Sequence, residues 1–300
     1  MEYFLKSIWP LIKKIGKDYF ALIGICWTIK EVTVYLFAPY ENIIKCIFSI
    51  SITLGVIIVL YKNKPPKEYS FGIKNRDIKI KLIIGDIIKK KATIVVPTNT
   101  TFDTRMDNDF ISLKSVQGQV QYKYFKNNLR TLDTLIEQEL KDKKYVRLND
   151  RTQSKNKQYE IGTTVEINQN GKRFYFLADS NINKNGQTIS PSIINITEAL
   201  SRLWQYISEY GHVESVAIPI IGTGRMGIIN SREEIIRQIV YSFVINNNTK
   251  KIANELLICI RKEDIRKYRI DIKEISEYIN HICKYQYENV EKDMVGTEIW

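Results

Sequence analysis

The stretch VESVAIPIIGTGRMG, residues 213–227, joins an apolar, β-rich run to a glycine-rich loop. The apolar run predicts a buried strand, and residues 222–227 fit the pattern G-x-G-x-x-G. The following sequence predicts a helix in which Ser231 and Glu234 have the spacing of a capping box. A glycine loop between a strand and a helix N-terminus lets backbone N–H groups approach an anion. The stretch therefore predicts a phosphate-binding turn, with a turn that is merely tight as the alternative.

Two common nucleotide motifs do not account for this loop. A Rossmann fingerprint belongs to the first βαβ unit and needs an acidic residue about 20 positions further on. This loop lies in the last third of the chain, and the corresponding residues 245–248 read INNN. No Gly-Lys-Ser/Thr follows the glycines, which excludes a Walker A loop. Another part of the chain must therefore identify the ligand.

Strand and helix signals alternate on both sides of the loop. Strands are predicted at residues 77–84, 93–96, 159–167, 173–178, 213–221 and 256–260, and helices at 129–140, 190–210, from 230 onward and 272–284. Asn170-Gly171 is a hairpin signal between two of these strands. This pattern predicts a layered α/β fold with mixed strand directions. Ligands in such sheets bind at the carboxyl ends of the strands, where residues 85–87, 97–99 and the glycine loop fall.

The first 67 residues differ in composition from the rest. Residues 19–38 and 43–61 are long apolar segments that approach the length needed to cross a bilayer. Basic residues precede the first segment and follow the second, which predicts that both ends are cytoplasmic. We expect a two-helix membrane hairpin and linker in residues 1–67, followed by a cytoplasmic domain in residues 68–300. A buried helical hairpin of a globular protein is the alternative.

Two charged residues, Lys30 and Glu31, interrupt the first apolar segment. Ionisable residues inside a membrane normally face protein or water, so they are candidates for a role in the membrane. Adjacent residues of a helix do not face each other, and their partners are expected on neighbouring helices or subunits. A first segment that lies at the membrane surface is the alternative.

Charge and cysteine content exclude several classes of protein. The net charge of +12 arises partly from lysines that flank the apolar segments, which favours contact with anionic lipid. The remaining basic residues are scattered without a nucleic-acid-binding motif, so no nucleic-acid partner is predicted. The four cysteines and two histidines form no metal-ligand cluster in the sequence, and no metal or cofactor is predicted.

The three loops together resemble the macro domain family. The resemblance runs from about Lys79 to Lys262 and rests on a strand followed by Gly-Asp-Ile, a second strand ending in Asn, and Ile-Pro-Ile-Ile-Gly-Thr-Gly. Macro domains have a three-layer α/β/α fold with a mixed sheet and bind ADP-ribose, and some hydrolyse it from its attachments. The resemblance therefore implies this fold and an ADP-ribose derivative as ligand.

The resemblance also implies a role for individual residues. Asp86 matches the acid that binds the adenine amino group, with Ile87 beside it, and Asn99 matches the Asn near the distal ribose. The loop around the diphosphate matches Gly222, Thr223, Gly224, Arg225, Met226 and Gly227. Either acid or amide could also serve only to stabilise its own turn.

The segment after Asn99 departs from the hydrolytic members of the family. These proteins carry a triple-glycine loop, whereas this chain has TFDTRM at residues 101–106 and no glycine run. This departure favours ligand binding without catalysis, and no catalytic residue is assigned. Arg105 and the segment Ser115, Val116, Gln117 and Gly118 are expected to take the place of the missing loop.

The order of a two-span hairpin and a macro domain resembles the macro-domain effectors of type II Thoeris, a bacterial anti-phage system. The resemblance implies that a TIR-domain enzyme makes an amino-acid conjugate of ADP-ribose, which the macro domain binds. Self-association and damage to the bacterial inner membrane would follow, with growth arrest or cell death. A membrane-tethered ADP-ribosyl hydrolase is the alternative function.

Overall fold

The chain consists of two compact units, residues 1–66 and 67–300. The computed structural model describes residues 2–36, 38–62, 66–106, 111–126, 128–149, 155–183, 188–189, 191–222 and 232–295. Its helices are α1 (Glu2–Leu36), α2 (Glu41–Lys62), α3 (Val116–Val120), α4 (Leu129–Glu139), α5 (Ile193–Tyr210), α6 (Arg232–Thr249), α7 (Lys262–Tyr268) and α8 (Ile272–Val295). Its strands are β1 (Glu68–Gly72), β2 (Lys79–Ile84), β3 (Thr93–Asn99), β4 (Val146–Arg147), β5 (Lys157–Gln158), β6 (Thr164–Gln169), β7 (Lys172–Ser180), β8 (Ser215–Pro219) and β9 (Glu255–Ile260).

The first unit is a helical hairpin. Helices α1 and α2 are joined by the short 3-10 turn η1 (Ala38–Tyr40). The rings of Trp27 and Phe48 meet edge to face between the two helices, with centroids 6.0 Å apart. In the part of the chain that the structure describes, no helix combines the length and the apolar character needed to cross a membrane.

The ion pair in the hairpin differs from the expectation. Lys30 Nζ lies 3.0 Å from Glu31 Oε1, so these adjacent residues pair with each other. Lys30 Nζ also lies 4.5 Å from the centre of the Trp27 ring and 5.8 Å from that of Phe48. The expectation that both partners lie on other helices was therefore wrong for Glu31. The long lysine side chain bends along the helix surface toward the neighbouring carboxylate and the two rings.

The second unit is built on a seven-stranded sheet of order β1-β2-β9-β8-β3-β7-β6. Strands β2, β9, β8, β3 and β7 are parallel, and the edge strands β1 and β6 are antiparallel to their neighbours. A second, two-stranded sheet consists of β4 and β5. The predicted mixed α/β sheet is confirmed, and the strand pairing places the ends of all five parallel strands at one edge.

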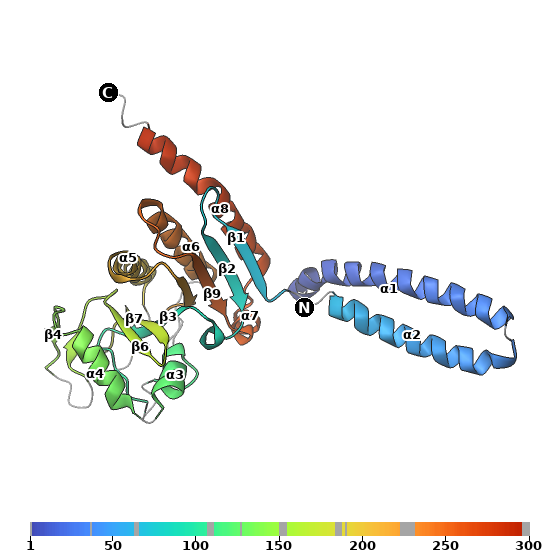
Figure 1. The fold of residues 1–300 in the computed structure, drawn as a ribbon, viewed down its shortest axis with the longest axis horizontal. Helices are drawn as coiled ribbons and strands as arrows, with labels where there is room; N and C mark the ends of the chain where they lie inside the picture. The colour runs from blue at the N-terminus through green and yellow to red at the C-terminus, as the bar shows by residue number, and fades with distance from the viewer. Residues whose placement is uncertain are drawn as a thin grey trace. The chain divides into compact units, whose positions relative to one another are not determined.

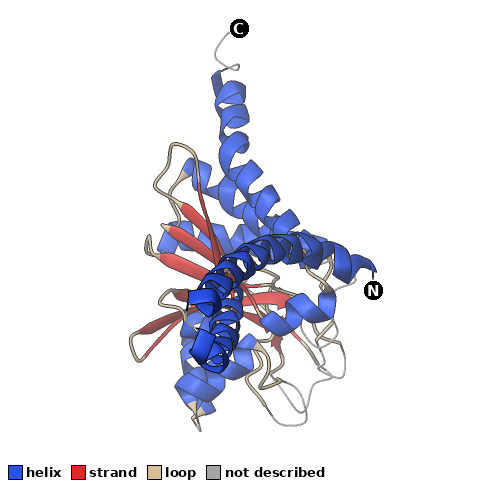
Figure 2. Ribbon diagram, turned by 90° about the vertical axis from the view of Figure 1, so that its right-hand side faces the viewer, coloured by secondary structure: helices blue, strands red, loops and turns tan. Residues whose placement is uncertain are grey.

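Helices cover both faces of the large sheet (Figures 1 and 2). Successive residues of β3 show this clearly: Val95 belongs to one buried cluster, and Ile94 and Val96 belong to the other. The first cluster includes buried side chains of α5, α6 and α8, such as Trp204. The second includes side chains of α4, such as Leu132. Two apolar layers separated by a sheet are the arrangement of a three-layer α/β/α domain.

Local signals in the sequence explain several element boundaries. Asn170 and Gly171 have φ angles of 50° and 69°, as expected of a tight hairpin turn between β6 and β7. Helix α5 begins at a capping box formed by Ser192 and Asn195, two residues later than the predicted start. It ends at Gly211, as predicted. Of the second predicted capping box, Ser231 lies outside the described residues.

Candidate functional site

The candidate site lies at the edge where the five parallel strands end. Gly85 follows β2, and its N–H donates to the carbonyl oxygen of Ile260, the last residue of β9, at 2.9 Å. Asn99 is the last residue of β3, and Gly222 lies in the turn that follows β8. The predicted convergence of the three loops is thus confirmed by the sheet topology. Ligand contact by their residues stays a prediction.

Asp86 caps the short 3-10 helix η2 (Ile87–Lys89). Its Oδ1 accepts a hydrogen bond from the backbone N–H of Ile88 at 2.9 Å. The side chain of Ile87 is buried in the core below. A carboxylate has about four acceptor positions, so this bond leaves capacity for an amine of a ligand. Asp86 therefore serves both as a cap and as a candidate acceptor.

Asn99 is buried and uses its side chain within its own loop. Its Oδ1 accepts from the backbone N–H groups of Thr101 and Asp103, both at 3.2 Å. The amide Nδ2 donates to Asp103 Oδ2 at 3.4 Å. The amide therefore stabilises the start of its own loop, as expected of a turn residue.

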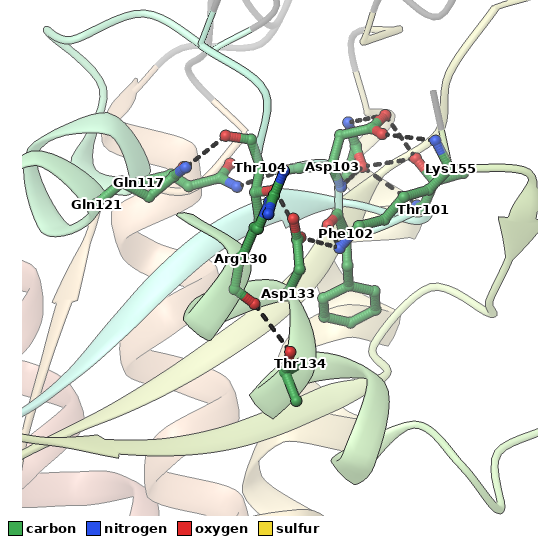
Figure 3. Close-up of polar contacts among 11 residues, drawn as sticks. Thr101, Phe102, Asp103, Thr104, Gln117, Gln121, Arg130, Asp133, Thr134 and Lys155 are labelled. Carbon is green, nitrogen blue, oxygen red and sulfur yellow. Dashed lines mark hydrogen bonds and ion pairs between the residues drawn. The ribbon is translucent and has the colours of Figure 1, made fainter. Parts of the chain in front are cut away.

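The segment 101–104 is held from several sides (Figure 3). Phe102 is fully buried and has a φ of 52°, which places its ring in the core beneath the loop. The backbone N–H of Lys155 donates to Asp103 Oδ1 at 3.2 Å, and Lys155 Nζ donates to the carbonyl of Phe102 at 2.9 Å. Thr104 Oγ1 and Lys155 Nζ both reach Asp133 Oδ1 of α4, each at 2.6 Å.

Helix α3 and the π-helical turn η4 (Gln121–Phe125) hold the same segment from the other side. Gln117 Nε2 donates to the carbonyl of Asp103 at 2.7 Å, and Gln121 Nε2 donates to the carbonyl of Thr104 at 2.5 Å. These two glutamines are four residues apart and therefore lie on one helical face. Residues 101–104, which stand in place of a glycine run, thus form a wall whose polar groups are hydrogen-bonded to the surrounding segments.

The remaining residues of the predicted segment also have internal contacts. Ser115 Oγ accepts from the backbone N–H of Gly118 at 3.0 Å and donates to the carbonyl of Ser112 at 2.7 Å. A Cβ atom at position 118 would lie 2.2 Å from that carbonyl oxygen, so the close approach requires glycine. Val116 packs against the second core cluster. Arg105 follows the wall and is half-buried.

The glycine loop is described only at its beginning. Gly222 has a φ of 68°, in the left-handed region that favours glycine. The predicted ligand residues Thr223, Gly224, Arg225, Met226 and Gly227 lie outside the described residues.

Sequence reasoning missed Asp179, which lies near the end of β7. Its side chain is 3% exposed, and its Oδ2 accepts from the backbone N–H of Gly222 at 2.9 Å. Burial raises the pKa of Asp179 to about 6, although hydrogen bonds from Gly222 and Ser180 oppose the shift. No local pattern in the sequence identifies this contact, because Asp179 and Gly222 are 43 positions apart.

The Cys259 thiol lies in β9 near the carboxyl edge of the sheet, and two pockets lie elsewhere on the surface. Burial raises the pKa of the Cys259 thiol to about 12, so the thiolate is scarce at neutral pH. Two surface pockets of about 440 and 720 Å³ are lined by other residues, around Arg202 and Arg173 respectively. Among the described residues, no group of three or more His, Cys, Asp or Glu side chains is placed to hold a metal ion.

The ionisation of Asp179 should be visible in the stability of the fold. Its folded pKa of about 6 exceeds the usual value of 3.8, so its contribution to the free energy of unfolding is greatest below about pH 4 and is lost as the pH rises through 6. Asp179→Asn removes the buried charge and keeps an acceptor for Gly222. We expect the variant to be more stable than the parent by up to about 3 kcal/mol at neutral pH, and equally stable at about pH 4. Urea unfolding across this pH range measures the difference, and a difference that does not change with pH would contradict this account.

Several solved structures are similar to this chain in fold. The Oceanobacillus iheyensis macrodomain with ADP is 14% identical, with a TM-score of 0.46, over 70% of this chain and 97% of that one. The same macrodomain with MES bound is 14% identical, with a TM-score of 0.45, over 71% and 96%. A tomato leucine aminopeptidase mutant is 14% identical, with a TM-score of 0.41, over 71% of this chain and 38% of its own. No curated protein matches the sequence.

Residues 80–261 match the family described as Thoeris protein ThsA, Macro domain. The matched region begins in β2 and ends directly after β9, so it includes all five parallel strands and the candidate site. Because this match spans more than half of the chain, the protein belongs to the Thoeris ThsA macro-domain family.

Proposed function

We propose that this protein is a receptor for an ADP-ribose-derived signal, which binds at the carboxyl edge of the sheet. The observation that carries the proposal is the meeting of Asp86, Asn99 and Gly222 at that edge in a chain of this family. Each lies at a position where the macro-domain pattern has a ligand-binding residue. The proposed ligand is held by protein groups alone, without a metal or a cofactor.

The order of the strands supports an orientation for the ligand. Asp86 follows β2, Gly222 follows β8 two strands away, and Asn99 ends β3 at the next strand. Neighbouring strands are about 4.8 Å apart, so β2 and β3 are separated by roughly 14 Å. Adenine at Asp86, the diphosphate at the glycine loop and the distal ribose near Asn99 follow the order of groups in ADP-ribose.

The contacts of the wall favour binding over hydrolysis. Asp103, the acid nearest to the position of the missing glycine run, is 2% exposed. It accepts from Asn99, Thr101 and Lys155, so its oxygens have structural partners. A general base must instead reach a water molecule beside the substrate. The proposed role is therefore that of a sensor, and an ADP-ribosyl hydrolase remains the second candidate because the family fold also supports that reaction.

The helical hairpin is the proposed effector element at the bacterial inner membrane. Its sequence has two long apolar segments between basic flanks. Large apolar side chains are exposed along both helices: Phe20, Ile25, Trp27, Ile29, Val32, Leu36, Ile43, Ile47, Ile50, Leu54, Ile57 and Ile58. Such an apolar surface favours contact with lipid or with other hairpins. In this proposal a TIR-domain enzyme supplies the signal, and the bound protein self-associates and damages the membrane.

Binding through Asp86 has a specific signature. Asp86→Ala should weaken ADP-ribose binding by about 1–3 kcal/mol, because a desolvated adenine amine loses its acceptor. The analogue with hypoxanthine in place of adenine lacks that amine, so the same substitution should change its affinity little. Calorimetric titration of both ligands shows whether the loss of affinity depends on the adenine amine. Asp77→Ala, at an exposed carboxylate, is the control. Equal losses of affinity for both ligands would contradict the placement of adenine at Asp86.

Selectivity among ADP-ribose compounds should arise beyond the distal ribose. A carboxylate on an amino-acid conjugate would gain a charge-assisted hydrogen bond from Arg105 or Arg225. We expect the parent protein to bind such a conjugate more tightly than ADP-ribose, and Arg105→Gln or Arg225→Gln to reduce this preference. Competitive titration measures the ratio of affinities. Equal affinities for ADP-ribose and every conjugate in the parent protein would refute the selectivity.

Membrane damage should require the hairpin. In cells that produce the signal, the full chain should depolarise the membrane and arrest growth, while residues 68–300 bind the signal without harm. Lys30→Leu combined with Glu31→Leu should reduce the damage, because the pair supplies the charge in the first apolar segment. A voltage-sensitive dye and growth curves measure these effects. If residues 68–300 arrest growth as strongly as the full chain, the toxic activity is soluble and the hydrolase becomes the better candidate.

A further inference from the structure

Asp179 occupies an irregularity in the sheet. In the pairing of β3 with β7, Thr98 lies opposite Ala178 and Asn99 lies opposite Ser180, so Asp179 is an extra residue in β7. Such a bulge redirects a side chain relative to the regular alternation of a strand. Here the Asp179 carboxylate reaches the backbone N–H of Gly222, which follows β8 on the other side of β3. The bulge thus connects the end of one strand to the first residue of the glycine loop.

This contact determines how the glycine loop begins. The N–H of Gly222 donates to Asp179 Oδ2 and points toward the protein interior. Gly222 adopts a φ of 68°, which a residue with a Cβ atom rarely adopts. The left-handed glycine and the carboxylate together set the direction in which the chain leaves β8. Asp179 therefore acts on the loop through its first residue.

Among the residues that the structure describes, no positively charged side chain compensates the Asp179 carboxylate. Its described partners are the Gly222 N–H, the Ser180 hydroxyl, which donates to Oδ1 at 3.0 Å, and its own backbone N–H. The neighbouring residues of β3 at this level, Thr98 and Asn99, do not titrate. Desolvation is the largest cause of its pKa shift, and no charged side chain of the described residues contributes. An ionised Asp179 thus places a negative charge, without a cationic partner among the described residues, against the first residue of a loop proposed to bind an anion.

We propose that Asp179 is the positioning residue of the glycine loop and that a diphosphate ligand binds there together with one proton, taken up by its carboxyl group. This inference rests on the proposed ADP-ribose site. The proton comes from solvent, and no other bond is made or broken. A neutral carboxyl group still accepts from Gly222 through one oxygen, and its hydroxyl can donate to Ser180 Oγ. Protonation therefore removes the charge that repels the diphosphate and retains the contact that positions the loop.

Proton uptake can be measured directly on the full chain. ADP-ribose is the probe, because its diphosphate diester stays fully ionised across the neutral range. Titration calorimetry in two buffers of different ionisation enthalpy gives the number of protons bound with the ligand. We expect net uptake by the parent protein near neutral pH and an affinity that falls by up to about tenfold per pH unit as the pH rises. Zero uptake and a pH-independent affinity would overturn the proposal.

Two variants separate charge from structure. Asp179→Asn preserves the shape and an acceptor for Gly222, so it should bind ADP-ribose without proton uptake and with an affinity independent of pH. If Asp179 had only a structural role, its replacement by Asn would leave the proton uptake unchanged. Asp77→Asn makes the same chemical change at a carboxyl group that is 97% exposed, and it should behave like the parent. Equal proton uptake in all three proteins would assign the proton to another group and refute the proposal.

A measurement without ligand makes the outcome independent of the proposed function. Labelling the full chain with ¹⁵N-glycine marks 14 positions, and the amide resonance of Gly222 should titrate with a midpoint near the pKa of Asp179, about 6. The titration should disappear in Asp179→Asn and persist in Asp77→Asn. If ADP-ribose does not bind at any pH, the proposed function fails. If ADP-ribose binds but Gly222 does not titrate, the function stands and the inference about Asp179 fails.

Discussion

The parallel hydrogen-bond ladder through β2, β9, β8, β3 and β7 is the constraint on which the rest of this domain depends. Parallel neighbours such as β8 and β9 require crossover connections, and the helices in these connections cover the two faces of the sheet. Because all five strands run in one direction, their following loops share an edge. The location of the candidate site therefore follows from strand direction, and the individual side chains determine its contacts.

Polar contacts at that edge belong to two separate parts of the site, the wall after β3 and the start of the glycine loop. On one side, the wall after β3 uses Asn99, Gln117 and Lys155 to satisfy its own backbone and side-chain groups. Buried polar groups need such partners, because an unmatched donor or acceptor costs about 1–3 kcal/mol. On the other side, Asp179 satisfies a single amide of the glycine loop and carries a charge that burial disfavours. The two contacts differ in kind, because the wall is held by neutral and paired groups whereas the start of the glycine loop is held by a group whose charge burial disfavours.

The hairpin illustrates how a charged pair adapts to apolar surroundings. Lys30 lies between the Glu31 carboxylate and the rings of Trp27 and Phe48. The side chain of Lys30 is 19% exposed, whereas that of Glu31 is 55% exposed. Cation–π contacts and an ion pair together offset part of the desolvation of the lysine. The acid is left accessible to further partners.

Local patterns in the sequence were sufficient for most of the fold. Apolar, β-rich runs predicted β2, β3, β8 and β9, and the Asn170-Gly171 turn predicted the β6–β7 hairpin, because strand preference and turn conformation depend on neighbouring residues. The short edge strand β1 was not predicted: its residues alternate between exposed and half-buried, but a run of five residues is a short signal for a strand. The three candidate loops could also be named, because the ends of buried strands are visible in sequence.

Only the tertiary structure decided what the residues of these loops contact. The wall depends on bonds such as the one from Lys155 to Asp103, 52 positions away, and the glycine loop depends on Asp179, 43 positions before Gly222. No periodicity relates residues so far apart, since their proximity arises from the order of strands in the sheet. The sequence by itself thus determined most of the longer elements, the order of the candidate loops and the family resemblance. The folded sheet decided that Asn99 supports its own loop, that Asp179 supports the glycine loop, and that Asp179 is buried deeply enough for its pKa to rise.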